Sequence, residues 1–429
     1  MKEKEELAIL GWIKDNQGKL VTLLQDLVRI PSVSGEELAV QKRLHQEFHR
    51  MDLNPEMFYP DERKLRKKKD FFETTSFQKY GYEDRPNVGG LLKGTGGRRS
   101  MCLSGHVDVV SPEPLDQWTR DPWSGDVVDD ELHGRGAGDM KAGVAAMLFA
   151  VKALQANGIK LKGDVQVETT IEEEDGGVGG VLYMRTIQPK TDAAFVPEPS
   201  TLTITVASAG VMYFRVIAPG IPAHAARAHV GVNAIQKMMP IISAIQTLHE
   251  ERQARIHYSF AETDPNNIGR ATTINIGTIN AGDWPSTVPG SCIIECRIGF
   301  PPGETNEEVM KEVEEAVKRA ANEDTWLKEN QPIVEWFGWR ARPHELKPTN
   351  EFVQLVKQSV IDVVGHETAF IGGSAGLDTR YFVHNGTPAV TCGPHAERIH
   401  SFDEVVNIES IVVTSQIIAK TLLEWCGVS

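Results

Sequence analysis

The sequence predicts an α/β protein in which a mostly parallel sheet, with helices on both faces, is interrupted by a smaller ferredoxin-like α+β domain. Short apolar runs alternate with helical patterns from about residue 100, which is typical of a parallel sheet covered on both sides. A β-α-β-β-α-β series then follows, which is the ferredoxin-like order. Because helix and strand patterns of the first kind resume afterwards, we expect a discontinuous domain of residues 1–204 plus 343–429 and an inserted domain of residues 205–342.

The first domain is expected to open with two helices. Residues 5–29 place apolar side chains at helical spacing, and Ser34-Gly35-Glu36-Glu37 has the S-x-x-E form of a capping box that would open a helix near residues 35–50. Residues 55–84 show no clear period and contain the basic run 63–69. This segment is interpreted as a surface insertion with solvated charges, and a basic patch for an anionic ligand is the alternative.

The other elements follow from apolar periodicity and from the turn residues between them. In the first domain we expect strands at residues 101–103, 165–171, 193–196 and 389–392, and helices at 140–157, 351–364 and 405–425. In the inserted domain we expect strands at residues 212–217, 272–278, 292–298 and 333–337, and helices at 232–252 and 306–322.

Composition excludes several classes of partner. The formal net charge is −14, from 45 Lys plus Arg against 59 Asp plus Glu, which argues against non-specific nucleic-acid binding. No apolar run is long enough to cross a membrane, and no export signal is visible. The five cysteines are odd in number and lie in apolar surroundings, which indicates reduced thiols. We therefore expect a cytoplasmic protein that acts on a small molecule, without nucleic-acid or membrane partners.

Metal-ligand side chains follow the predicted strands, at the edge where an open α/β sheet binds its ligands. These residues are His106, Asp108, Asp139, Glu172, Glu173, Glu174, Glu198, His395, Glu397 and His400. Carboxylates packed so closely would repel one another unless cations lay among them. Nitrogen and oxygen ligands without thiolate suit zinc, with cobalt or manganese as substitutes. The pattern predicts two Zn²⁺ ions, hydrolytic chemistry at a water that bridges them, and a glutamate of the Glu173-Glu174 pair as general base.

Seven stretches extend this pattern along nearly the whole chain: SGHVDVV, GRGAGDMKAG, EEEDGG, PEPS, GIPAHAARAHVGVNAI, GGSAGLDTRYF and HSFDE. In this order they resemble the dinuclear zinc amidohydrolases that include acetylornithine deacetylase, succinyl-diaminopimelate desuccinylase, aminoacylase and glutamate carboxypeptidase. The resemblance implies hydrolysis of the amide bond of a small N-acyl amino acid. Cleavage of a dipeptide or of a C-terminal residue by the same mechanism is the alternative.

The resemblance also implies a role for individual residues. The two metal sites would share Asp139, with His106, Asp139 and Glu198 holding one ion and Asp139, Glu174 and His400 the other. Glu173 would be the general base, and Asp108 would orient His106 through its second ring nitrogen. The bond between Asp139 and Met140 is commonly cis in this family. Two departures are Glu172, where many members have aspartate, and the additional imidazole of His395.

The resemblance also implies contacts with the substrate and between subunits. Ser374 and Arg380 would lie near a carboxylate of the substrate, and Arg297 is a further candidate for that contact. In dimeric members the inserted domains pair. We therefore expect a homodimer through a lid domain of residues 205–342, with His224 reaching the partner subunit's site to donate a hydrogen bond to the oxyanion.

Two other classes of function compete with this interpretation. Residues 372–376 fit G-x-S-x-G, so that Ser374, Asp378 and His400 could form the triad of a serine hydrolase. The short chain that remains after this motif leaves little room for the strands which that fold requires. A catalytically inactive metal-binding module is the other alternative, and Glu173, which binds no metal in the scheme, argues against it.

Overall fold

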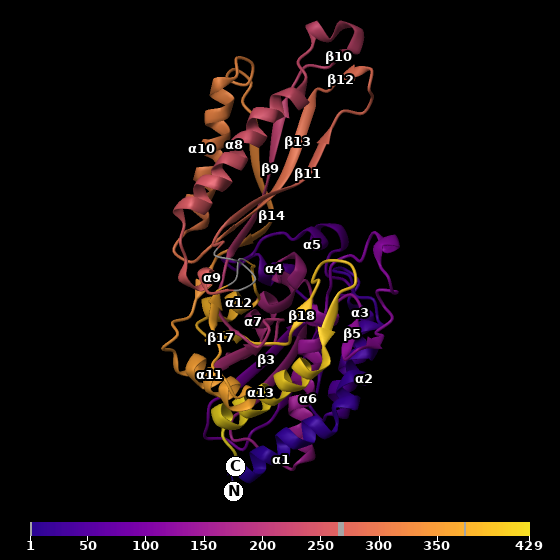
Figure 1. Ribbon diagram of the computed structural model, residues 1–429, viewed down its shortest axis with the longest axis vertical. Coiled ribbons are helices and arrows are strands. Elements are labelled where there is room, and N and C mark those ends of the chain that lie inside the picture. Colours follow the sequence, from indigo (N-terminus) through magenta and orange to yellow (C-terminus); the bar gives the residue numbers. More distant parts are fainter. Residues whose placement is uncertain (1, 265–269, 373–374) are drawn as a thin grey trace. The chain divides into compact units, whose positions relative to one another are not determined.

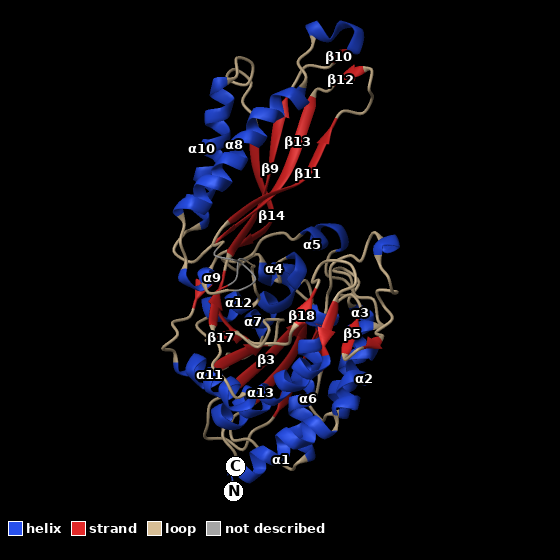
Figure 2. Ribbon diagram, in the orientation of Figure 1, coloured by secondary structure: helices blue, strands red, loops and turns tan. Residues whose placement is uncertain are grey.

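The computed structural model describes residues 2–264, 270–372 and 375–429 (Figure 1). The chain forms two compact units. The first comprises Met1–Val206, Leu346–Ile371 and Leu377–Ser429, and the second comprises Ala207–Glu345 with Gly372–Gly376. Each unit is built around its own sheet (Figure 2).

The large sheet has the strand order β1-β2-β6-β3-β7-β17-β8-β15, and β16 also pairs with β8. These strands are β1 (Glu56–Phe58), β2 (Asn87–Leu92), β3 (Met101–His106), β6 (Val165–Thr170), β7 (Ala193–Val196), β8 (Ile204–Ser208), β15 (His344–Glu345), β16 (Phe370–Gly372) and β17 (Ala389–Thr391). The neighbours β6, β3, β7 and β17 run parallel, whereas β1, β2, β8 and β15 pair antiparallel. The predicted α/β sheet is thus confirmed as a mixed sheet with a parallel centre.

Five helices of the first unit pack together. They are α1 (Lys2–Asp15), α2 (Gln17–Val28), α6 (Ala142–Ala156), α11 (Glu351–Val364) and α13 (Ile408–Cys426), and α6 and α13 contact each other and β3. Nearly every residue of α6 is buried, which explains its almost wholly apolar sequence. The remaining helices are α3 (Leu38–Arg50), α4 (Glu62–Leu65), α5 (Thr75–Tyr80), α7 (Tyr183–Ile187) and α12 (Thr379–His384).

A small antiparallel sheet in the first unit has the order β18-β19-β5-β4. Its strands are β4 (Val127–Val128), β5 (Glu131–His133), β18 (Ala396–Glu397) and β19 (Val405–Asn407). Strands β18 and β19 contact the turn η2 (Ala137–Lys141). This sheet therefore brings the segment that contains His400 beside the turn that contains Asp139.

The second unit has the predicted ferredoxin-like arrangement. Along the chain it contains β9 (Gly210–Pro219), α8 (Ala234–Arg255), β11 (Thr273–Ala281), β13 (Ser291–Phe300), α10 (Asn306–Glu323) and β14 (Ile333–Ala341). The sheet order β11-β13-β9-β14 places the four strands as second, third, first and fourth. Helices α8 and α10 lie together on one face (Figure 2). Buried side chains alternate along β9 and β13 because only one face of the sheet meets these helices. Two short pieces, β10 (Ala223–His224) and β12 (Thr287–Val288), pair outside this sheet, and α9 (Ser259–Glu262) follows α8.

Three local expectations were wrong. The single helix expected at residues 5–29 is interrupted at Asn16, whose side-chain amide donates to the carbonyl of Trp12. The capping box does not form, since helix α3 begins at Leu38 without a side-chain cap, and Ser34 donates to Asp108 instead. The final helix begins at Ile408 because residues 405–407 form β19.

The interpretation of residues 55–84 as a surface insertion was also wrong in part. The basic run 63–69 is exposed except for Leu65. The residues after it are not a solvated loop, because Thr74, Ser76 and Tyr82 are buried. Across the described ranges, none of the helices combines the length and the apolar composition needed to cross a bilayer.

Candidate metal centre

Strand ends position the residues that the sequence singles out. His106 is the last residue of β3, Glu174 lies in the turn η3 (Glu173–Asp175) after β6, and Glu198 follows β7. Gly143 of α6 leaves room for the chain before Glu198, since a Cβ there would meet the Pro197 carbonyl at 2.1 Å. Asp139 lies in η2, and its peptide bond with Met140 is cis, as the resemblance implies.

Two groups of possible metal ligands share Asp139, and they are the groups of this kind found in the described part of the chain. In the first, His106 Nε2 lies 3.1 Å from Asp139 Oδ1 and 3.4 Å from Glu198 Oε1. In the second, His400 Nε2 lies 3.3 Å from Asp139 Oδ2 and 2.9 Å from Glu174 Oε2. The two oxygens of Asp139 therefore face different groups.

The donor atoms fit divalent cations. Each group offers one imidazole nitrogen and two carboxylate oxygens, which are ligand types that bind Zn²⁺ in proteins. Ligands about 2.0–2.1 Å from a tetrahedral zinc lie roughly 3.3 Å apart. The nitrogen–oxygen distances in both groups, from 2.9 to 3.4 Å, are close to this separation.

The electrostatics of the centre favour added positive charge. Burial raises the pKa of Glu174 to about 7 and the pKa of Glu198 to about 8, and repulsion from Asp139 adds to both shifts. Burial opposes protonation of His400, but Asp139 and Glu174 outweigh it and raise the pKa of His400 to about 11. Burial would raise the pKa of Asp139, yet the two imidazoles hold that pKa well below its usual value. The carboxylates thus repel one another, and the few cationic groups present do not offset this repulsion for all of them.

Asp108 connects His106 to the turn after β6. The Nδ1 atom of His106 lies 2.9 Å from the backbone oxygen of Asp108 and 3.5 Å from its carboxylate, so the ring is oriented by the carbonyl. The carboxylate accepts hydrogen bonds from the backbone N–H groups of Glu173 and Glu174, at 3.0 and 3.2 Å, and from the Ser34 hydroxyl at 2.8 Å. It therefore fixes the backbone that presents both glutamates, which the sequence does not suggest.

Glu173 has a buried carboxylate oxygen without a hydrogen-bond partner among the described residues, Oε1. Burial raises the pKa of this side chain well above its ordinary value, and Asp378 contributes to the shift. A buried oxygen without a hydrogen-bond partner is uncommon in folded proteins and calls for an explanation, such as a catalytic role or a bound water or ion.

Glu404 is a residue of the centre that the sequence did not single out. Its carboxylate accepts from the backbone N–H groups of Gly138 and Asp139, at 2.9 and 3.1 Å, and forms a buried ion pair of 2.6 Å with Arg135. It thereby holds the turn that carries Asp139. Its place at the end of the HSFDE stretch was the available signal.

The residues expected to contact the substrate differ in their surroundings. Arg380 is buried, and its guanidinium donates to the carbonyls of Gly176 and Leu377, at 2.6 and 2.9 Å. Its contacts fasten the end of the turn that contains Glu173. Ser374 lies outside the described residues. His395 is half-buried, 3.2 Å from the Thr201 hydroxyl and 3.3 Å from Glu397.

Two expected residues belong to the second unit. Arg297 on β13 is half-buried and lies 3.5 Å from the Thr273 hydroxyl, and burial lowers the pKa of its guanidinium. His224 in β10 is exposed, and its Nδ1 accepts a hydrogen bond of 3.1 Å from the Ala226 N–H. In the neutral ring the proton is then on Nε2, which is available as a donor.

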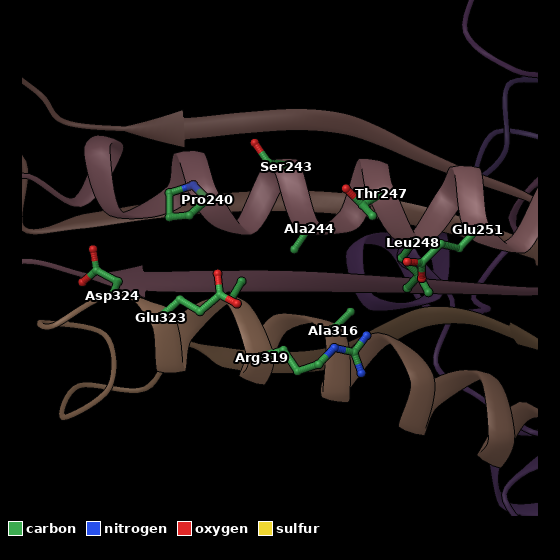
Figure 3. Close-up of a pocket in the computed structure, with 11 residues that line it drawn as sticks. Pro240, Ser243, Ala244, Thr247, Leu248, Glu251, Ala316, Arg319, Glu323 and Asp324 are labelled. Atoms are coloured by element: carbon green, nitrogen blue, oxygen red, sulfur yellow. The ribbon is translucent and has the colours of Figure 1, made fainter.

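A separate groove of about 580 Å³ lies between α8 and α10 of the second unit (Figure 3). Small side chains such as Ser243 and Ala316 line it, with Glu251, Arg319 and Glu323 at its sides. It contains none of the residues of the two ligand groups. The residues of both ligand groups lie in the first unit.

The sequence and the fold both have relatives among known proteins. The family model described as peptidase family M20/M25/M40 matches residues 102–424. The chain is 28% identical over 365 residues to N-formyl-4-amino-5-aminomethyl-2-methylpyrimidine deformylase of Halalkalibacterium halodurans, which covers 80% of this chain and 84% of that protein. It is 27% identical over 333 residues to succinyl-diaminopimelate desuccinylase of Marinobacter nauticus, which covers 76% and 83%.

Among solved structures, human carnosine dipeptidase 1 has the same fold. Its TM-score is 0.76, its sequence identity is 17%, and the match covers 98% of each chain. The family model spans both ligand groups, the turn with Glu173 and the second unit. The protein is accordingly a hydrolase that belongs to peptidase family M20/M25/M40.

Proposed function

We propose that this protein hydrolyses the amide bond of a small N-acyl amino acid, using two divalent cations held by the ligand groups and Glu173 as general base. The observation that carries the proposal is the pair of ligand groups that share Asp139, next to an unpaired oxygen of Glu173. The two relatives named above are, by their names, a deformylase and a desuccinylase, which supports removal of an acyl group from nitrogen.

In this scheme His106, Asp139 and Glu198 hold one cation, and Asp139, Glu174 and His400 hold the other. Zinc is the proposed metal, and cobalt or manganese would fit the same donors. Two such cations would polarise the scissile carbonyl and lower the pKa of the attacking water.

In this scheme side chains of the protein transfer the proton of the attacking water. Glu173 accepts it from the attacking water at Oε1 and returns it to the leaving nitrogen. Asp108 keeps the Glu173 backbone in place through the hydrogen bond of 3.0 Å. For the substrate's carboxylate we keep Ser374 and Arg380 as candidates, with Arg297 as a further one; the guanidinium of Arg380 also donates to the carbonyls of Gly176 and Leu377.

We also propose a homodimer formed by the second unit, in which His224 acts on the partner's site. Large apolar side chains are exposed on this unit: Ile221, Val230, Ile235, Met239, Ile279 and Trp284. Ile235 and Trp284 line one surface hollow with Thr287, and Thr287 pairs with His224 across the β10–β12 ladder. An apolar patch beside a free imidazole donor supports a subunit contact at this place.

Since all five cysteines are free and buried, we further propose a reducing, cytoplasmic environment.

The second candidate function is cleavage of a dipeptide or of a C-terminal residue, because a peptide bond presents the same carbonyl and leaving nitrogen. A serine hydrolase at Ser374 has less support, since His400 lies within 2.9 Å of Glu174 and 3.3 Å of Asp139. An inactive metal-binding module would not need the carboxylate of Glu173, which is buried and has one oxygen without a hydrogen-bond partner among the described residues.

A substrate panel tests the proposal. Zinc-loaded protein is assayed against N-acetyl and N-succinyl amino acids and against dipeptides, before and after chelation. We expect turnover of an N-acyl amino acid that chelation abolishes and zinc restores. Full activity of the metal-free protein, together with inactivation by a serine-directed phosphonate, would contradict it and favour Ser374.

A further inference from the structure

The carboxylate of Glu172, the residue that departs from the family pattern, is enclosed by the segment of residues 74–85. Its side chain and that of Thr74 are fully buried, and Ser76 is 6% exposed. It accepts hydrogen bonds from the Thr74 hydroxyl at 2.6 Å, the Ser76 hydroxyl at 2.8 Å and the Tyr82 hydroxyl at 3.1 Å. Side chains that lie almost a hundred residues away in the sequence therefore fix one carboxylate beside the catalytic turn.

The backbone of Glu172 has a conformation that needs such support. Its φ is 69°, in the left-handed region that residues with a side chain rarely adopt. Conformations of this kind persist where the surroundings over-determine them. Immediately after Glu172, the chain presents Glu173 and Glu174.

The enclosing segment is itself anchored at two points. Arg85 is buried, donates to both oxygens of Glu37 at 2.7 and 2.9 Å, and lies 3.4 Å from Glu172. The backbone N–H of Ser76 donates to Asp175 at 2.5 Å, at the far end of the same turn. The segment therefore holds the turn η3 from both sides.

We propose that Glu172 is a positioning residue, held by the hydroxyl groups of Thr74, Ser76 and Tyr82, that sets where Glu173 and Glu174 point. This inference rests on the proposed function, in which Glu173 is the general base and Glu174 a metal ligand. Loss of the hydroxyl groups would leave the catalytic side chains present but misplaced. Small misplacements of catalytic groups reduce rates by up to about 10²-fold, and loss of groups that orient ligands weakens metal binding about 10–100-fold.

The test compares Thr74→Val with Thr74→Ser, which keeps the hydroxyl. The Thr74 hydroxyl also caps α5 by accepting a hydrogen bond from the Phe77 N–H. Tyr82→Phe is therefore a second test variant, because it removes one donor to Glu172 and leaves this cap intact. Thr75→Val is the matched control, because Thr75 is exposed next to Thr74. The readouts are kcat and KM at saturating zinc on the best N-acyl amino acid of the panel, zinc affinity by chelator competition, and Tm.

For Thr74→Val and Tyr82→Phe we expect kcat to fall about 10–100-fold with little change in KM, and zinc to bind more weakly at one of the two sites. Thr74→Ser and Thr75→Val should behave as the unsubstituted protein does. Unchanged kcat and zinc affinity in Thr74→Val and Tyr82→Phe, with or without a lower Tm, would show a structural role only and overturn the inference. Glu173→Gln, assayed in parallel, separates the two claims, because an active Glu173→Gln would refute the proposed function itself.

Discussion

At the scale of single residues, the centre depends on carboxylates that bind the backbone of other site residues. Asp108 accepts from the N–H groups of Glu173 and Glu174, and Glu404 accepts from those of Gly138 and Asp139. The sequence could predict the ligand types of His106, Glu174 and Glu198, because these residues follow strands of the large sheet. Asp139 and His400 instead come from segments at the small sheet β18-β19-β5-β4. It could not predict these contacts, since a hydrogen bond to a backbone N–H selects no residue type at the donor position.

The pair of Glu404 and Arg135 supports a prediction about stability. Glu404→Ala leaves the buried guanidinium of Arg135 uncompensated and two N–H groups unpaired, so we expect the free energy of unfolding to fall by about 3–5 kcal/mol. Urea unfolding measures this change. The control Glu62→Ala removes an exposed partner of Arg66 and should cost less than about 1 kcal/mol. Equal losses in the two variants would contradict the account.

At the scale of elements, apolar periodicity predicted the main strands and helices, because most of them bury one continuous face. The ends of elements were predicted less well. The S-x-x-E pattern at Ser34 and Glu37 was wrong as a capping box, because both side chains bond to distant partners, Asp108 and Arg85. Residues 55–84 lacked a period because their buried groups, such as Thr74 and Tyr82, are polar and serve Glu172.

Helix α3 provides a prediction about pH. Glu47 is buried within 2.6 Å of Arg43, 3.0 Å of Arg50 and 2.5 Å of Lys152. Burial would raise its pKa, but Lys152 and Arg43 outweigh burial and lower the pKa to about 2. A lowered folded-state pKa stabilises the protein above the ordinary value of 4.5, and this stabilisation is lost as the pH falls toward 2.

Glu47→Gln should therefore lower the free energy of unfolding by about 2 kcal/mol near neutral pH, and by progressively less below about pH 4.5. Urea unfolding of both proteins at several pH values gives this difference. Glu36→Gln, at an exposed position of the preceding turn, is the control and should show no such trend. A difference that stays constant or grows toward low pH would show that Glu47 is not held ionised.

At the scale of the whole molecule, the order of elements predicted the parallel centre of the large sheet and the ferredoxin-like sheet, because each motif requires a particular sequence of strands and helices. The division into a ligand-bearing unit and a ferredoxin-like unit follows from that order. What the order leaves open is the use of the exposed apolar patch around Trp284 and His224.

Mixing two inactive variants tests the proposed dimer. Glu173→Ala and His224→Ala are each expected to lose most activity, since an oxyanion donor is worth about 10²–10³ in turnover. Under conditions of subunit exchange, mixed dimers contain one site with both residues intact, so activity should reappear. Each variant mixed with itself is the control. No recovery despite demonstrated exchange, or a strictly monomeric active protein, would return His224 to a surface role.

The most direct test of the central claim is to measure zinc content and kcat of Glu173→Gln and Glu174→Gln side by side. The account predicts that Glu173→Gln binds as much zinc as the unsubstituted protein while its kcat falls by about 10²–10⁴-fold, because only the proton acceptor is lost. Glu174→Gln should lose zinc from one of its two sites. A Glu173→Gln protein that lacks zinc, or that turns over at the full rate, would contradict the assignment of Glu173 as general base.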